Sequence, residues 1–331
     1  MKALVPLLAS LILAAVAAGA QTVPRAPDGH ADLTGVWSNA SLTQLSRPPG
    51  SPLVVSEAEA RARAARVAAA MAADLKPTDP NAGGLGVAPV VAQGFNAFWT
   101  DSGDSYARVK GQYRASWIVD PADGQQPLSA AGEALERAAA LTRARQDPDG
   151  PEHLSPNDRC IIGSRGSGGP GMLNNVYNSN YQIVQTPGAV VIVVEMAHDA
   201  RTIPIFATQA AAQAAHGPAV LQRWLGDSTA WWEGDTLVID TVNVNPQQGR
   251  FGPIHLSAGG RVTERLTRAS PSEIFYQFQV EDPVYYTRTW RAEMTWKSLH
   301  DVVYEYACHE GNYAMPGILA AARGIRGGAG N

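Results

Sequence analysis

The sequence predicts a mainly β protein, in which an antiparallel meander closes into a lipocalin-like β-barrel with N-terminal helices and long loops packed outside. After residue 175, apolar and polar residues alternate with a period of two, as in strands that bury one face. Short turns join these strands, and closing such a sheet removes its unpaired edges. The chain lacks the strand–helix alternation of a parallel α/β fold, and a β-sandwich is the alternative architecture.

The first helix expected from the sequence covers residues 56–75. Ser56 and Glu59 form a capping box, which satisfies free backbone N–H groups at the start of a helix. The run that follows is rich in alanine, the best helix former, and Pro77 ends it. We expect this helix to lie outside the barrel.

The rest of residues 21–174 is predicted to be an irregular excursion with one more helix. That helix is expected at about 130–145, and a short strand is expected at 113–120. The glycine-rich segment GSRGSGGPG, residues 163–171, neither follows a strand nor opens a helix, and it lacks the terminal Lys-Ser/Thr of a phosphate-binding P-loop. We therefore interpret this segment as a flexible loop.

The main sheet is expected over residues 175–313. Residues 181–198 and 229–244 each contain two apolar runs around a short turn, which predicts two β-hairpins. Residues 289–297 alternate cleanly between apolar and polar side chains, and residues 274–281 do the same except that Phe275 lies on the otherwise polar face. These segments together predict the successive antiparallel strands of the barrel wall.

The N-terminus has the pattern of a secretory signal peptide. Lys2 provides a positive charge, an apolar run follows, and residues 18–20 are the small residues that a signal peptidase needs. The apolar run is short for a membrane span and has no stop-transfer pattern after it. We expect residues 1–20 to be removed and residues 21–331 to form one domain in the periplasm or outside the cell. A retained N-terminal anchor is the alternative.

Cys160 and Cys308 are the two cysteines of the chain. In an oxidising compartment, an isolated pair is most simply explained by one disulfide, whereas two free buried thiols are the alternative. Closing a loop of this size would stabilise the fold by up to about 5 kcal/mol. The bond would fix a late barrel strand, residues 304–310, to the N-terminal excursion.

Net charge argues against a nucleic-acid partner. The formal net charge is −4, and charged residues make up 17% of the chain, so no basic stripe is available to bind phosphates. The sequence has no second apolar run long enough to span a membrane after signal cleavage. A small molecule is therefore the expected partner.

Several motifs make the chain similar to a family of uncharacterised signal-peptide-bearing bacterial proteins. These motifs include RAPDGHADLTGVW (25–37), EMAHDAR (195–201), RWLGDSTAWWEGDTLVIDT (223–241) and YEYACHEGNYAMPGIL (304–319). The resemblance covers most of the mature chain but implies no mechanism, because the family has no established activity. This chain departs from the shared pattern at residues 229–231, where a glycine and a basic residue are expected, and in the alanine-rich segment 209–219.

Five titratable residues on the expected strands are candidates for a catalytic cluster. A carboxylate on an apolar strand face is costly unless it is paired, which draws attention to Glu195 and Glu264. His198 and His309 are their natural titrating partners, and Glu305 shares the face of His309. Glu195 and His198 fall on opposite faces of a regular strand, so a β-bulge between them would be needed.

Each candidate also has a purely structural alternative. Either strand glutamate could pair with Arg201, Arg265 or Arg288, and His309 could simply cap the last strand. Trp232 could belong to the packing at the barrel rim.

Asn180, Tyr181, Trp232 and Tyr306 are the predicted ligand-binding residues. Asn180 and Tyr181 belong to an Asn-Tyr-rich run that supplies neutral hydrogen-bonding groups. We expect no metal and no cofactor, because the histidines and carboxylates lack a recognised ligand spacing such as H-E-x-x-H.

The sequence therefore predicts a barrel that holds a small, partly apolar molecule in a cavity. Acid–base chemistry of a lyase or isomerase type, carried by histidine and glutamate, is the first hypothesis. A non-catalytic, lipocalin-like carrier is the first alternative, and a metal-dependent hydrolase is the second. Titratable groups clustered in the cavity would favour the enzyme, whereas an apolar lining with one or two polar groups would favour the carrier.

Overall fold

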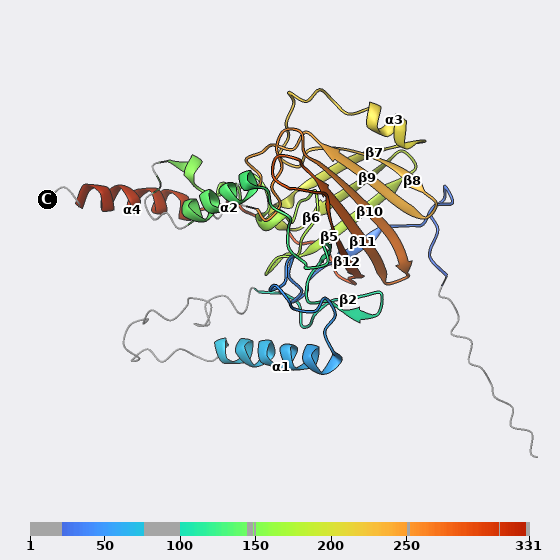
Figure 1. The fold of residues 1–331 in the computed structure, drawn as a ribbon, viewed down its shortest axis with the longest axis horizontal. Helices are drawn as coiled ribbons and strands as arrows, with labels where there is room; N and C mark the ends of the chain where they lie inside the picture. Colours follow the sequence, from blue (N-terminus) through green and yellow to red (C-terminus); the bar gives the residue numbers. More distant parts are fainter. Residues whose placement is uncertain are drawn as a thin grey trace, which may run out of the picture.

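Nine strands form a closed β-barrel of mixed strand direction (Figure 1). The computed structural model describes residues 22–75, 100–143, 148, 150–249, 252–310 and 312–328, so the expected signal peptide lies outside the described residues. Strand β1 pairs with both β5 and β12, which closes the ring. In order around the barrel, the strands are β1 (Gly35–Ser38), β5 (Asn180–Thr186), β6 (Ala189–Val194), β7 (Ala200–Phe206), β8 (Asp227–Glu233), β9 (Thr236–Val242), β10 (Arg261–Ser270), β11 (Glu273–Glu281) and β12 (Trp290–Ser298). The prediction of a mainly β protein with a barrel is confirmed.

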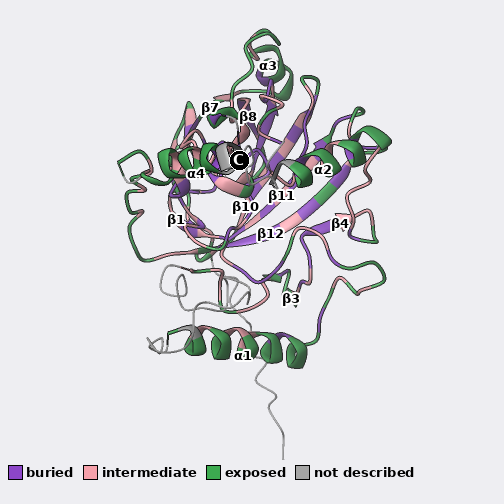
Figure 2. Ribbon diagram, turned by 90° about the vertical axis from the view of Figure 1, so that its left-hand side faces the viewer, coloured by how far each residue is buried: buried purple, intermediate pink, exposed green. Residues whose placement is uncertain are grey.

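The expected helices are present outside the barrel. The side chain of Ser56 accepts a hydrogen bond from the backbone N–H of Glu59 at 3.2 Å, which starts α1 as the capping box predicts. Helix α1 lies apart from the barrel with a largely exposed surface, and α2 and α4 extend from one side of it (Figure 2). The helices are α1 (Glu57–Asp74), α2 (Ala130–Arg143), α3 (Gln209–Ala214) and α4 (Ala314–Gly328).

Three short strands and three single turns of 3-10 helix complete the described elements. The expected strand at 113–120 is present only in part, because β3 and β4 cover its two ends. The short elements are β2 (Arg108–Val109), β3 (Gln112–Tyr113), β4 (Ile118–Asp120), η3 (Pro151–His153), η4 (Ser164–Gly166) and η5 (Met196–His198).

The prediction that all neighbouring strands run antiparallel is wrong at one place, because β7 and β8 run parallel. They pair only at Ile205 with Ala230 and at Phe206 with Trp231. A parallel pair needs a crossover of a dozen or more residues, and residues 207–226, which include α3, provide it. The alanine-rich segment 209–219 thus begins the crossover.

The prediction of a late barrel strand at 304–310 is also wrong. No residue in that range has strand structure, and most of them are exposed. The reason is that both edges of β12 are already occupied, by β11 on one side and by β1 and β4 on the other. A further strand would have had no free edge to join.

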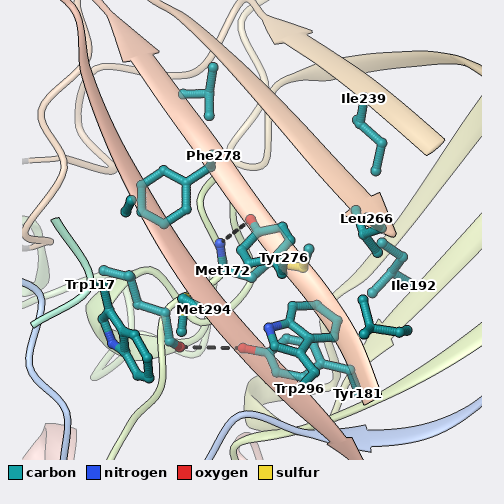
Figure 3. Packing of buried hydrophobic residues seen from close by; sticks show 14 of the residues in the cluster. Trp117, Met172, Tyr181, Ile192, Ile239, Leu266, Tyr276, Phe278, Met294 and Trp296 are labelled. Carbon is teal, nitrogen blue, oxygen red and sulfur yellow. Dashed lines mark hydrogen bonds between the residues drawn. The ribbon is translucent and has the colours of Figure 1, made fainter. Parts of the chain in front are cut away.

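Large side chains fill the barrel interior, as the period-two pattern predicts. Tyr181 stacks on Trp296 with ring centroids 4.5 Å apart, and Tyr276 lies 4.9 Å from the same indole (Figure 3). Phe278 and Trp290 pack edge to face at 5.7 Å. All five side chains are at most 1% exposed, so these rings form a packed core.

The glycine-rich segment is not a flexible loop, because it is packed into one mouth of the barrel. We call residues 163–173 the plug loop. The backbone N–H of Met172 donates to the Tyr276 hydroxyl at 2.9 Å, and Met172 is fully buried (Figure 3). Gly169 has φ +81°, and a Cβ atom there would lie 2.7 Å from Arg201 Nη1. Glycine is therefore required by this close approach.

The N-terminal segment closes the opposite mouth. The backbone N–H of Leu33 donates to Gln185 Oε1 at 2.8 Å, and the Trp37 indole donates to the Leu33 carbonyl at 3.0 Å. His30 stacks on Trp232 with ring centroids 4.5 Å apart. Because both mouths are filled, access for a ligand has to be sought at the barrel rim.

Candidate functional site

The glutamate predicted inside the barrel is present, and it forms an ion pair. Glu264 is fully buried, and its carboxylate accepts hydrogen bonds from Arg201 Nη1 at 3.0 Å and from Nη2 at 2.5 Å. The Tyr276 hydroxyl donates to Glu264 Oε1 at 2.6 Å, and the Gly171 backbone N–H donates to the same oxygen at 3.2 Å. The structural alternative, pairing with Arg201, therefore applies to Glu264.

Burial and the glutamate charge perturb the groups around this ion pair. Burial raises the pKa of Tyr276 well above its ordinary value, and the negative charge of Glu264 raises it further. Burial alone would lower the pKa of Arg201, but the attraction of Glu264 outweighs it and leaves that pKa raised. Arg201 thus keeps its charge inside the barrel, where Ser228 and Thr241 also accept hydrogen bonds from it.

Glu195 and His198 lie on the turn that joins β6 to β7. Ala197 and His198 both have positive φ, +59° and +58°, so the chain turns sharply after Glu195. Glu195 Oε2 accepts from Asn180 Nδ2 at 2.6 Å, and Oε1 accepts from the backbone N–H of Tyr304 at 3.2 Å. His198 Nδ1 accepts from the backbone N–H of Tyr306 at 3.3 Å. Both side chains therefore hold the segment 303–308, which we call the strap.

A disulfide anchors the strap to the loop that precedes the plug. Cys160 and Cys308 are bonded, as predicted, with their Cα atoms 5.7 Å apart. Asn312 Nδ2 donates to the Asp158 carbonyl at 2.8 Å and adds a second link. The strap thus crosses the barrel exterior from the β6–β7 turn to the residues around Cys160.

The five candidate catalytic residues do not form one cluster. Glu264 is paired inside the barrel, and Glu195 and His198 hold the strap. Glu305 and His309 are exposed. Glu305 and His309 were assigned to one face on the assumption of a regular strand, and the strap is not a strand.

Of the four predicted ligand-binding residues, Asn180 and Tyr306 both contact the β6–β7 turn, through Glu195 and His198, but the four do not line one pocket. Asn180 bonds to Glu195, and Trp232 is at the N-terminal mouth. Tyr181 is fully buried, its hydroxyl donates to the Ser167 carbonyl at 3.1 Å, and burial raises its pKa. Tyr306 is half-buried. Burial raises the pKa of the neighbouring Tyr177 hydroxyl, and the interaction with Tyr306 raises it further.

Two adjoining pockets open at the plugged mouth, and we call them together the mouth cleft. They share Arg165 and Pro253 in their walls. The apolar pocket, of about 90 Å³, is lined by Ser155, Pro156, Asn157, Ile162, Gly163, Ser164, Arg165, Gly166, Pro170, Gln248, Gly252, Pro253 and Ile254. The polar pocket, of about 260 Å³, is lined by Ser41, Thr43, Gln44, Leu45, Ser102, Arg165, Leu173, Asn174, Asn175, Val176 and Pro253.

Hydrogen bonds from the core hold the walls of the polar pocket. The Trp117 indole donates to Asn174 Oδ1 at 2.9 Å, and Asn174 Nδ2 donates to the Ser41 carbonyl at 2.7 Å. Asn175 Nδ2 lies 2.5 Å from Ser164 Oγ of the plug loop. These bonds join three segments that are far apart in the sequence, which explains why no local motif revealed the cleft.

Arg165 occupies the junction of the two pockets. It is exposed, has φ +54°, and precedes Gly166 with φ +81°. It has no hydrogen-bond or ion-pair partner in the described part of the chain. Arg165 was not predicted as a site residue, because the glycine-rich segment around it is also typical of a flexible loop. Those same glycines were the available signal.

A partly buried histidine outside the cleft was not predicted either. His216 lies in the β7–β8 crossover, and its Nε2 is 3.0 Å from Asp240 Oδ2. Its Nδ1 is 3.6 Å from Asp227 Oδ2, which also accepts from the Gly217 backbone N–H at 2.7 Å. These contacts fasten the crossover to β8 and β9, a structural role.

The described residues offer no metal centre and no membrane helix. No three histidine, cysteine, aspartate or glutamate side chains among them are grouped so as to hold a metal ion. In the same residues, no helix combines the length and apolar character needed to cross a membrane.

The chain has no match among protein-family models, curated proteins or solved structures. The resemblance to the signal-peptide-bearing bacterial family therefore stays a prediction.

Proposed function

We propose that this protein is an exported binding protein that holds a small, partly apolar molecule in the mouth cleft. The observation that carries the proposal is the union of an apolar and a polar pocket around an unpaired Arg165. Ligand sites combine apolar walls with a few convergent polar groups, and this cleft has that composition. The packed plug loop forms its floor, so the walls are held in place before a ligand arrives.

The lining of the cleft supports binding in preference to acid–base catalysis. Among the described residues that line it, none is a histidine, an aspartate or a glutamate. The titratable residues expected to move protons have other partners, since Glu264 is paired with Arg201, and Glu195 and His198 hold the strap. The carrier hypothesis is therefore better supported than the lyase or isomerase hypothesis.

Two features support a periplasmic or secreted location. The first is the signal-peptide pattern of residues 1–20. The second is the Cys160–Cys308 disulfide, because such bonds persist mainly in oxidising compartments. A carrier in this setting would meet small molecules outside the cytoplasm.

The Trp117 indole provides a direct reporter of the cleft, because it donates to Asn174 in the wall of the polar pocket. We expect fragments that combine an apolar and a polar part to shift the Trp117 indole signal in nuclear magnetic resonance spectra. The Trp231 indole donates to Glu233 on the outer surface and serves as an internal control that should not move.

A pair of matched variants tests whether that shift comes from the cleft. Val176 lines the polar pocket and is 47% exposed, whereas Val184, outside the cleft, is 41% exposed. Val176→Phe should block binding, and Val184→Phe should leave it intact. If no fragment shifts Trp117 at millimolar concentration, or if Val176→Phe binds as well as the wild type, the proposal is wrong.

A further inference from the structure

We infer that the mouth cleft takes a carboxylate with a short apolar tail, bound through the guanidinium of Arg165 and the side-chain amide of Asn157. This inference rests on the proposed binding function and adds the chemical class of the ligand. Three independent observations support it: the charge of the lining, the backbone conformation of Arg165 and an unpaired amide donor.

The charge of the lining favours an anion. Arg165 is the one formally charged residue among the described residues that line the cleft. By contrast, Arg201 pairs with Glu264, and Arg265 pairs with Glu233. An ammonium ligand would meet a positive charge and no carboxylate among the described lining residues, whereas a carboxylate would meet a free guanidinium.

The backbone of Arg165 is held in an unfavourable conformation at this point. Left-handed φ values are rare for residues with a Cβ atom, and such outliers concentrate at binding and catalytic sites. The Ser167 backbone N–H donates to the Ser164 carbonyl at 3.1 Å and closes the turn around Arg165. Asn175 Nδ2 donates to the same carbonyl at 3.3 Å. The plug loop therefore fixes Arg165 at the junction of the two pockets.

Asn157 supplies the second donor. Its Nδ2 atom is buried and has no hydrogen-bond partner among the described residues, and the residue lines the apolar pocket. A buried amide N–H without a partner is unfavourable, and an acceptor from a ligand would satisfy it. A carboxylate has two oxygens, so one can pair with Arg165 while the other accepts from Asn157.

The volumes and linings of the two pockets indicate which groups the rest of the ligand carries. Pro156, Pro170, Pro253 and Ile254 surround the apolar pocket, whose volume of about 90 Å³ suits a short alkyl chain or a small ring. The polar pocket is richer in hydroxyl and amide groups and suits a hydroxylated extension. One guanidinium and one amide match a monoanion better than a phosphate, which usually gathers several cationic groups.

Three probes with the same four-carbon chain separate charge from shape: butanoate, butanamide and butylammonium. Titrations followed by the Trp117 indole signal should give butanoate a dissociation constant at least tenfold lower than that of butanamide. Butylammonium should bind more weakly than either. Arg165→Gln should weaken butanoate binding tenfold or more, and should remove the preference of the site for butanoate over butanamide. Asn157→Ala should weaken butanoate binding severalfold.

Controls keep the result interpretable. Arg61→Gln removes a charge from the exposed helix α1 and should leave butanoate affinity unchanged. Arg165→Lys should retain part of the preference for the anion, which separates loss of charge from loss of fold. Equal binding of butanoate and butanamide would overturn the inference and leave the proposed function standing. An unchanged butanoate affinity in Arg165→Gln would also overturn it. Absence of any Trp117 shift, with these probes and with the fragments, would overturn both.

Discussion

The Asp199 carboxylate accepts a hydrogen bond from the backbone N–H of Gly163 at 2.7 Å and so ties the β6–β7 turn to the first residue of the plug loop. Burial raises the pKa of Asp199 from 3.8 to about 6, although the bond from Gly163 opposes the shift. A Cβ atom at Gly168 would lie 2.8 Å from the same carboxylate, so glycines on both sides make room for it. The plug loop is therefore built around a carboxylate whose protonated form is favoured by burial.

Replacement of Asp199 by asparagine should stabilise the protein at neutral pH. Because the folded-state pKa is raised, the folded state holds its proton more tightly, so the stabilising contribution is fully present below the unfolded-state pKa. It is lost as the pH rises from about 4 to about 6. Asparagine keeps an oxygen acceptor for Gly163 without the buried charge. The variant should gain about 1–3 kcal/mol at pH 7.5 in urea unfolding.

The pH profile provides the control for this prediction. The advantage of Asp199→Asn should shrink as the pH falls towards 4, because the wild-type carboxyl becomes protonated in both states only below its unfolded-state pKa of 3.8. An advantage that stays constant between pH 4 and pH 7.5 would show that the effect does not arise from titration of Asp199.

Replacement of His216 by glutamine should destabilise the barrel at the β7–β8 crossover. The Asp240 side chain is 1% exposed and lies against both His216 and Arg261. Removing the imidazole leaves Arg261 as a partner, so we expect a loss of about 1–3 kcal/mol, less than for a fully broken buried pair. Urea unfolding measures the loss. His300→Gln, at an exposed histidine, is the matched control and should change stability little.

The regular elements of the fold could be predicted from the sequence because they depend on local patterns. Alternation within β11 and β12 assigned the inward residues correctly, and Ser56 marked the start of α1. The parallel β7–β8 pair could not be predicted in the same way. This pairing depends on where the crossover, residues 207–226, brings the chain back to the sheet, and no short sequence pattern encodes that position.

The candidate site was harder to predict because it has no local signature. Asn157, Arg165 and Asn174 stand on separate segments and meet only after the plug loop fills the barrel mouth. The alternation of side chains correctly placed Glu264 on the buried face of its strand, since β10 is a regular strand. It failed for His309, because β12 had no free edge for another strand.

Removal of the disulfide should destabilise the protein and loosen the strap. The bond closes a sequence separation of 148 residues, so the double variant Cys160→Ser/Cys308→Ser should lose about 2–5 kcal/mol. Dithiothreitol should lower the melting temperature of the wild type towards that of the variant. An identical melting temperature for oxidised wild type and variant would contradict this expectation.

Breaking the ion pair in the barrel should have the largest effect on stability. In Glu264→Gln, the guanidinium of Arg201 stays buried at 2% side-chain exposure without its carboxylate. Loss of one partner of a buried pair costs about 3–5 kcal/mol, because the remaining charge has lost both water and its counter-ion. We expect the same order of loss from Arg201→Met. Chemical unfolding of both variants measures it.

The double variant Arg201→Met/Glu264→Gln separates a lost interaction from an unpaired charge. With both charges removed, no buried charge is left unpaired, and the glutamine Oε1 can still accept from the Tyr276 hydroxyl. The double variant should therefore be more stable than either single variant, which a double-mutant cycle quantifies. Additive losses would contradict this account of the pair. They would indicate that Arg201 and Glu264 act independently, through contacts such as those with Ser228 and Gly171.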